Sequence, residues 1–460
     1  MMQKQTHRQS PIARWITAAL FFCLLANFAG AQEISGSRVR LNRDRGLQIL
    51  STIKDIMKKE YYDPKFHGLD LDKHFKETSA RIKELDTAPQ IFTAIAQFLL
   101  DFNDSHTRYV PPDRINEVEY GFSVQMIGNA CRVVEVKHGG NAEAQGLKVG
   151  EDISDISGYS PRRDSLWALI YLLYSLDPRP ELTLSVVGID GHTRQMLIPA
   201  RLVTRDDRKR ESNRRKDLER QRPELKSKPY KCQEVDSNLI ACKLYTFSVE
   251  TSVIDKMMKE VGEHQKMILD LRGNGGGYVE TESHLTGYFF DHDVKIGNEI
   301  GRKKGVERIA KSRKAKAFNG KLVVLVDSRS ASASEVFARV MQIEKRAQVV
   351  GDTSAGAVMT SVLYPLDLNV MLGARESVYG WMSLTIGDLV MSDGQRLEGT
   401  GLVPDLIKVP SGAELAEKSD PTLAFAASLC GADLSKKEAG NFYFIARVPE
   451  EGDEEDKDDK

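Results

Sequence analysis

The sequence predicts an α/β protein, and three observations along its 460 residues support that fold class. Apolar residues recur at helical spacing from Leu41 to Leu100. Strand and turn chemistry follows from Tyr120 to about Val203. From Tyr230 to about Val409, short β-branched runs alternate with amphipathic helices, which is typical of a largely parallel sheet covered by helices. A chain of this length is expected to form two or three domains.

Residues 1–31 predict a secretory signal peptide. A basic segment is followed by the apolar run Trp15–Phe28 and by small residues before an expected cleavage site after Ala31. The apolar run is shorter than the roughly 20 residues that span a bilayer. We therefore expect an exported protein, periplasmic or extracellular, without a stable membrane span. The formal net charge of −1 gives no global argument for binding nucleic acid.

Residues 32–115 are expected to form an N-terminal helical region. Its last segment reads "DFNDSHTRYVPPDR", where Pro111 and Pro112 prevent a helix from continuing. His106 of this segment lies between the helical pattern and the two prolines. Taken alone, such a histidine is more often a cap or core residue than a functional group.

Residues 116–204 combine short strands with glycine-rich turns. The segment "YGF" is followed in order by "AEAQGLKVGEDISDISG", and this series resembles a PDZ domain. The resemblance implies that the backbone amides of Tyr120, Gly121 and Phe122 bind the C-terminal carboxylate of a peptide, which adds a strand to the sheet.

Residues 205–228 predict a charged linker. Between Arg201 and Lys216, eight basic residues face three acidic ones, but aromatic residues for base stacking are missing, so a solvated helix or linker is favoured over a nucleic-acid site. Residues 411–460 are expected to form a C-terminal extension. Its end, residues 450–460, carries eight acids and two lysines and predicts a disordered tail.

Four cysteines remain once the signal peptide is removed. Cys232 and Cys242 flank "QEVDSNLIA", which predicts a hairpin with its turn at Asp236–Asn238. Export permits a disulfide between them. Free buried thiols are an equal alternative, because the sequence shows no dense disulfide framework and no metal-ligand spacing.

Residues 229–410 are expected to form the α/β core, and they contain "LVDSRSASASEVFARVM". An apolar strand pattern changes here to a helical one, so Ser332 lies in a strand-to-helix turn. Ser332 and Glu335 have the spacing of a capping box. A helix N-terminus also offers free amides to an anion formed beside it. This local pattern therefore fits both a helix cap and a nucleophile.

Four segments separate these alternatives: "ILDLRGNGGG", "VVLVDSRSASASE", "VVGDTSAG" and "RLEGTGLVPD". In this order they resemble the core of the C-terminal processing, or tail-specific, serine peptidases. The resemblance implies a crotonase/ClpP-like peptidase core with an N-terminal helical region and an inserted PDZ domain. It also implies Ser332 as nucleophile, with an oxyanion hole from the amides of Ala333 and Gly276, where the neighbours Gly275 and Gly277 are alternatives.

The catalytic base departs from the better-known members of that family. The position that resembles their lysine is Ala357, and neither Lys345 nor Lys321 lies where it can replace that lysine. A branch similar to the tricorn core protease lacks the lysine and uses a histidine. The resemblance to this branch implies a Ser-His-Ser-Glu tetrad, with His106 as base, Ser105 beside it and Glu398 as the carboxylate.

The sequence therefore predicts an exported serine endopeptidase that cleaves peptides or protein C-terminal segments through an acyl-enzyme. No metal or organic cofactor is expected, and polypeptides are the expected partners. Two alternatives stay open. The first is a catalytically silent, PDZ-containing peptide-binding or scaffold protein, in which Ala357 marks a lost activity. The second, which rests on fold analogy alone, is a crotonase-like enzyme acting on an acyl thioester.

Overall fold

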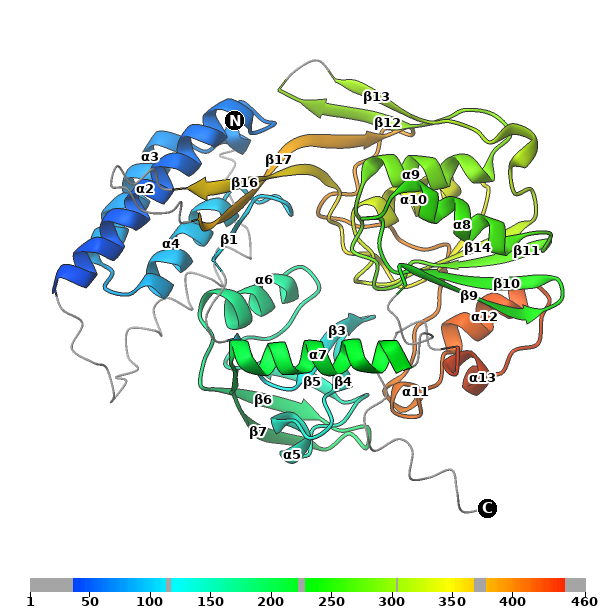
Figure 1. Cartoon of the computed structure of the whole chain (residues 1–460), viewed down its shortest axis with the longest axis horizontal. Helices are drawn as coiled ribbons and strands as arrows, with labels where there is room; N and C mark the ends of the chain where they lie inside the picture. The colour runs from blue at the N-terminus through cyan, green and yellow to red at the C-terminus, as the bar shows by residue number, and fades with distance from the viewer. Residues whose placement is uncertain (1–35, 113–116, 222–227, 303–304, 368–377, 443–460) are drawn as a thin grey trace, which may run out of the picture.

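The computed structural model describes residues 36–112, 117–221, 228–302, 305–367 and 378–442 (Figure 1). The predicted signal peptide and the acidic tail lie outside these residues. None of the described helices is both long and apolar enough to cross a membrane. The described residues form a helical unit and an antiparallel sheet module, each with one apolar core, and an α/β core with apolar clusters on both faces of its sheet.

The α/β core is built on a six-stranded sheet with the order β18-β15-β14-β11-β10-β9. All neighbouring pairs are parallel except β9 and β10, as the alternation of strands and helices predicts. The strands are β9 (Tyr230–Asp236), β10 (Leu239–Leu244), β11 (Lys266–Asp270), β14 (Lys321–Val326), β15 (Gln348–Gly351) and β18 (Leu406–Ile407).

Helices cover both faces of this sheet (Figure 1). Successive strand residues point to opposite faces, so Val324 packs toward α8, α9 and α10, whereas Val323 and Leu325 pack toward α12. The strands are apolar on both sides for this reason. These helices are α8 (Thr251–Val261), α9 (Val279–Thr286), α10 (Ala333–Ile343), α12 (Pro421–Leu429) and α13 (Lys436–Gly440). The short helix α11 (Gly412–Ala416) lies instead against the antiparallel module, where Gly412 packs on Gly150.

A disulfide joins Cys232 of β9 to Cys242 of β10, its directly opposite partner in the hairpin. The structure thus contains the pairing that the sequence left open. The other two described cysteines, Cys131 and Cys430, are buried free thiols.

The N-terminal helical unit packs against a second sheet (Figure 1). Helices α2 (Gly36–Glu60), α3 (Leu71–Glu84) and α4 (Ala88–Leu100) share one core with Met382 and Leu384 of β17. The sheet order is β1-β17-β12-β13, with β16 also paired to β17. Its strands are β1 (Arg108–Val110), β12 (Val294–Gly301), β13 (Val306–Ala310), β16 (Met359–Asp367) and β17 (Val378–Met391). Long strands from the core thus reach the helical unit.

The segment predicted as a PDZ domain forms a five-stranded antiparallel sheet with the order β3-β4-β5-β6-β7, so β3 is an edge strand. In the sequence, α5 connects β4 to β5, and α6 and η2 connect β5 to β6. Strand β2 pairs with β8 in a separate two-stranded sheet. The elements are β2 (Glu117–Glu119), β3 (Phe122–Ile127), β4 (Ala130–Val136), α5 (Asn141–Ala144), β5 (Asp152–Ile156), α6 (Leu166–Ile170), η2 (Tyr171–Leu176), β6 (Glu181–Val187), β7 (Thr193–Pro199) and β8 (Arg201–Val203).

Helix α7 (Arg205–Gln221) occupies most of the segment predicted as a charged linker, and it lies across the antiparallel module (Figure 1). Ion pairs join Arg208 to Glu117 and Lys137 to Glu211, so charged contacts attach the helix to the module. The sequence left a solvated helix or a linker open for this segment, and its described residues form a helix.

Candidate active site

Ser332 lies in the turn between β14 and α10, and the predicted capping box is present. Its backbone has φ 55° and ψ −118°, a conformation that L-residues rarely adopt. The Ser332 N–H donates to the Ala357 carbonyl (2.9 Å) and to the Glu335 carboxylate (2.9 Å). A residue held at positive φ by its surroundings stores about 1–3 kcal/mol of strain, which is common at functional sites.

The glycine turn Gly275–Gly277 passes directly beside Ser332. A Cβ on Gly276 would lie 2.7 Å from the Ser332 Cβ and 3.1 Å from the Ala333 nitrogen, so only glycine fits. The Gly276 N–H itself donates to the Asn274 side chain at 2.9 Å. Among the hydrogen bonds of the described residues, the amides of Gly275 and Gly277 have no acceptor. These two neighbours are therefore freer donors than the predicted Gly276.

The carboxylate of Glu335 ties the Ser332 turn to the segment that follows β15. Its Oε2 accepts the N–H groups of Ser332 (2.9 Å) and Ala357 (3.0 Å). Its Oε1 accepts the Gly356 N–H (2.8 Å) and the Ser354 hydroxyl (2.5 Å). Burial raises the pKa of Glu335 to about 7, and these hydrogen bonds act against the rise. Three backbone N–H groups and one hydroxyl thus donate to the single buried carboxylate of Glu335.

Ser105, His106 and Glu398 come together although they lie in distant parts of the chain. The Ser105 hydroxyl is 2.7 Å from His106 Nδ1 and donates to Glu398 Oε2 at 2.9 Å. The Ser105 N–H donates to Glu398 Oε1 at 2.8 Å. Burial lowers the pKa of His106 and raises the pKa of Glu398. The structure thus brings these three predicted site residues into one hydrogen-bonded group.

When Glu398 is ionised, these contacts assign one tautomer to neutral His106. The single proton of the Ser105 hydroxyl is donated to the Glu398 carboxylate, which only accepts when ionised. Ser105 Oγ must therefore accept a hydrogen bond from His106 Nδ1–H. The free lone pair then lies on Nε2, which is the atom a general base uses.

Ala357 and Val358 connect the two halves of the site. The Ala357 carbonyl accepts from Ser332, and the Val358 N–H donates to Glu398 Oε2 at 2.8 Å. Within the described residues, the halves meet through this backbone and not through a hydrogen bond between His106 and the Ser332 hydroxyl. Ala357 thus lies beside Ser332, and its side chain is only a methyl group.

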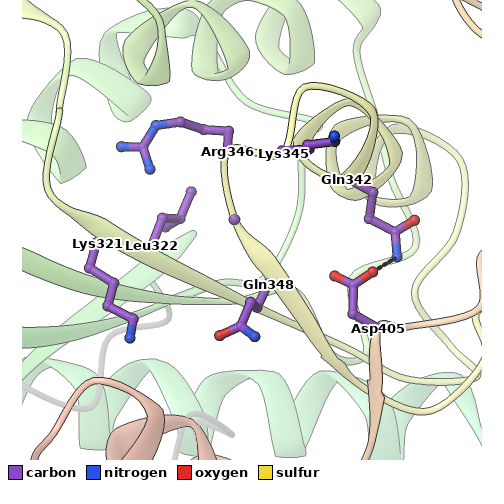
Figure 2. A pocket seen from close by; sticks show the side chains of 8 residues that line it. Lys321, Leu322, Gln342, Lys345, Arg346, Gln348 and Asp405 are labelled. Atoms are coloured by element: carbon purple, nitrogen blue, oxygen red, sulfur yellow. Dashed lines mark hydrogen bonds between the residues drawn. The ribbon is translucent and has the colours of Figure 1, made fainter.

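Lys321 and Lys345 lie at the opposite end of the parallel sheet. Figure 2 shows both at a pocket of about 390 Å³, together with Arg346, Gln348 and Asp405. Lys321 begins β14, whereas Ser332 follows the end of that strand, and six strand residues span roughly 20 Å. The Lys321 ammonium donates to the Leu429 carbonyl. Neither lysine is placed to act on Ser332.

The edge strand β3 contacts the segment just before Ser332. The Arg329 guanidinium donates to the Val124 carbonyl at 2.8 Å, and the Ser328 hydroxyl donates to the Met126 carbonyl. Alternate residues of an edge strand offer such carbonyls to an added strand. Part of the β3 edge is therefore occupied by the segment that leads to Ser332.

Tyr120 and Gly121 directly precede β3, and Phe122 is its first residue. Tyr120 is fully buried, and its hydroxyl exchanges hydrogen bonds with the backbone of Arg179. Gly121 has φ 79° at the turn, and Phe122 starts the strand. The Tyr120 side chain thus holds the turn in place, whereas the half-buried Phe122 side chain and the backbone of the turn remain accessible to a peptide.

Two side chains at the site were not singled out from the sequence. Asn274 accepts from Gly276 and donates to the Leu244 carbonyl, and Asp104 accepts from the turn that contains His106. An Asp or Asn two residues before a turn residue is a local signal for such contacts.

Within the described residues, no group of three or more His, Cys, Asp or Glu is placed to hold a metal ion.

Comparison with known proteins identifies the core. The family model "Peptidase family S41" matches residues 240–408. The chain is 22% identical over 345 residues to the chloroplastic carboxyl-terminal-processing peptidase 1 of Arabidopsis thaliana, covering 70% of this chain and 64% of that protein. It is also 22% identical over 415 residues to the carboxy-terminal processing protease CtpA of Bacillus subtilis, covering 86% and 77%.

A solved structure shares the fold. The structure of mature CPAF complexed with lactacystin superposes with a TM-score of 0.61 at 13% identity, covering 82% of this chain and 96% of that one. This likeness and the family match confirm the predicted α/β peptidase fold. The chain therefore contains a peptidase S41 domain, which spans residues 240–408.

Proposed function

We propose that the protein is a serine endopeptidase in which Ser332 is the nucleophile and His106 the base. The observation that carries the proposal is the hydrogen-bonded series Glu398–Ser105–His106, joined through Val358 and Ala357 to the backbone of Ser332. A base oriented by a third group beside a nucleophile is the arrangement that acyl transfer requires.

In the proposed reaction, His106 Nε2 takes the Ser332 hydroxyl proton while Oγ bonds to the carbonyl carbon of the scissile peptide bond. Two backbone amides stabilise the oxyanion: that of Ala333 and that of Gly277 in the glycine turn. His106 then gives the proton to the departing amine as the C–N bond breaks. Water, activated by the same histidine, hydrolyses the acyl-enzyme. Catalytic hydrogen bonds often tighten only when substrate binds, so the free structure need not join His106 to Ser332.

The relatives named as C-terminal processing proteases support polypeptides as substrates. In our proposal the PDZ-like sheet binds substrate C-termini through the backbone of Tyr120, Gly121 and Phe122. The positive φ of Gly121 and the start of β3 at Phe122 fit that use.

The test combines a fluorophosphonate probe with a matched pair of unstructured peptides. We expect the probe to label wild-type protein on Ser332, with no labelling in Ser332→Ala. A peptide with a free C-terminus should be cleaved faster than the same peptide with an amidated end, and Ser332→Ala should cleave neither. Folded wild-type protein that takes no label would instead favour the silent peptide-binding alternative. Equal cleavage of both peptides would remove the proposed role of the C-terminus.

The proposal places the active protein outside the cytoplasm, on the strength of residues 1–31. The mature chain isolated from its host should then begin at Gln32, as N-terminal sequencing would show. An intact N-terminus at Met1 would contradict export by this route.

A further inference from the structure

Asp104 is a buried carboxylate that the proposed mechanism does not use. Its side chain is 6% exposed. Oδ1 accepts the backbone N–H groups of His106 (3.1 Å) and Thr107 (2.6 Å) and the hydroxyl of Thr385 (2.6 Å). Oδ2 accepts the Tyr61 hydroxyl at 2.7 Å. Both oxygens are therefore occupied by donors of the protein itself.

The segment that presents His106 has no regular structure of its own. It connects α4 to β1, and Asn103 within it has φ 54°. Asp104 forms an Asx-type turn with His106, because its side chain takes the role of a backbone acceptor. Without that carboxylate, the backbone N–H of His106 would lose its acceptor, and the turn would lose one restraint on the direction of the imidazole.

The same carboxylate anchors this turn to two other elements. Tyr61 follows the end of α2, and Thr385 belongs to β17. The Thr385 N–H donates to the Thr107 hydroxyl at 3.1 Å, and the Thr385 carbonyl accepts from Tyr62 at 3.2 Å. The position of His106 is thus set by the helical unit and by the long strand that extends from the core.

Three charged residues lie around His106, and they belong to different parts of the chain. Asp104 lies on its own segment, Arg108 begins β1, and Glu398 is reached through Ser105. Burial lowers the pKa of His106 most strongly, Asp104 raises it and Arg108 lowers it. Removing the charge of Asp104 would therefore lower this pKa further.

We propose that Asp104 is a positioning residue, which holds the Ser105–His106 turn in its productive orientation and stabilises the positive charge that His106 acquires on taking the Ser332 proton. This inference rests on the proposed function. Asp104 does not touch the reacting atoms, because its oxygens are filled by the turn, by Tyr61 and by Thr385.

The first test is Asp104→Asn, which keeps the size of the side chain and one carbonyl acceptor. We expect kcat on a peptide substrate to fall about ten- to a hundredfold with little change in KM, because misplacing a catalytic group costs about that much. The acid limb of the kcat/KM profile should move to lower pH by roughly half a unit to one unit, because His106 loses a nearby negative charge. A purely structural role would not move this limb.

Asp101→Asn is the matched control. Asp101 lies in the same connection but pairs with His74 and Gln97, so both kcat and the acid limb should stay at wild-type values. Wild-type kcat and an unmoved limb in Asp104→Asn would overturn the inference. So would a shift of the same size in Asp101→Asn.

Thr385→Val keeps the inference testable if Asp104→Asn does not fold. It removes one donor to Asp104 Oδ1 but leaves the charge, so we expect kcat to fall severalfold while the acid limb stays in place. Wild-type kcat in folded Thr385→Val would overturn the positioning role. Failure of the proposed function gives a different result: His106→Ala would then leave probe labelling of Ser332 unchanged, whatever Asp104→Asn does.

Discussion

Replacing His106 by alanine is expected to lower kcat/KM for a peptide substrate by about a thousandfold to ten-thousandfold. General-base catalysis contributes up to about four orders of magnitude, and nucleophile and base act as a unit. Nε2 of His106 is left free to accept a proton by the contacts of Ser105 and Glu398. Steady-state hydrolysis by wild-type and variant protein at several pH values measures the effect.

Lys345→Ala is the control for the base. Lys345 lies with Lys321 at the pocket of Figure 2, at the far end of the sheet, so its loss should leave kcat/KM unchanged. If Lys345→Ala lost activity and His106→Ala kept it, a lysine mechanism would have to replace the proposed one. Circular dichroism of both variants shows whether each retains its fold.

Truncating Glu335 to alanine is expected to lower the free energy of unfolding by about 3–5 kcal/mol, because four buried donors lose their acceptor at once. The donors are the amides of Ser332, Gly356 and Ala357 and the hydroxyl of Ser354. Activity should be lost as well, since the same contacts hold the strained Ser332 turn. Urea denaturation monitored by fluorescence measures the stability change.

Two further substitutions serve as a milder variant and as a control for Glu335→Ala. Glu335→Gln keeps the volume and one acceptor oxygen, so it should cost less than Glu335→Ala. Glu344→Ala changes an exposed glutamate at the end of the same helix and should stay within about 0.5 kcal/mol of wild type. A loss below about 1 kcal/mol in Glu335→Ala would show that water replaces the carboxylate and that the turn does not depend on it.

Much of the core was predictable because its signals are local. The strand-to-helix change around Ser332, the three glycines after β11 and the hairpin at Cys232 and Cys242 each lie within a short segment. The α/β class followed from the alternation of such segments, and the family match confirms it. Ser105, His106 and Glu398 were named through a family resemblance, since no local pattern relates two segments so far apart in sequence.

Other features depended on contacts that no spacing encodes. The sequence pointed to Gly276 as an oxyanion donor, but the Asn274 side chain already engages that amide. Glu335 was expected to cap a helix, and it also binds the segment after β15. The contact of Arg329 with β3 joins two units whose docking has no sequence signature.

By itself, the sequence determined the order of the units, the strand and helix pattern of the core and the presence of Ser332 in a helix-start turn. Only the tertiary structure decided which groups meet there: Glu398 with Ser105, Ala357 with Ser332, and Asp104 with Tyr61 and Thr385. The physical reason is the distance along the chain over which each interaction acts. Backbone propensity and hydrophobic periodicity act over a few residues, whereas a buried hydrogen bond joins whichever donor and acceptor the packed elements bring together.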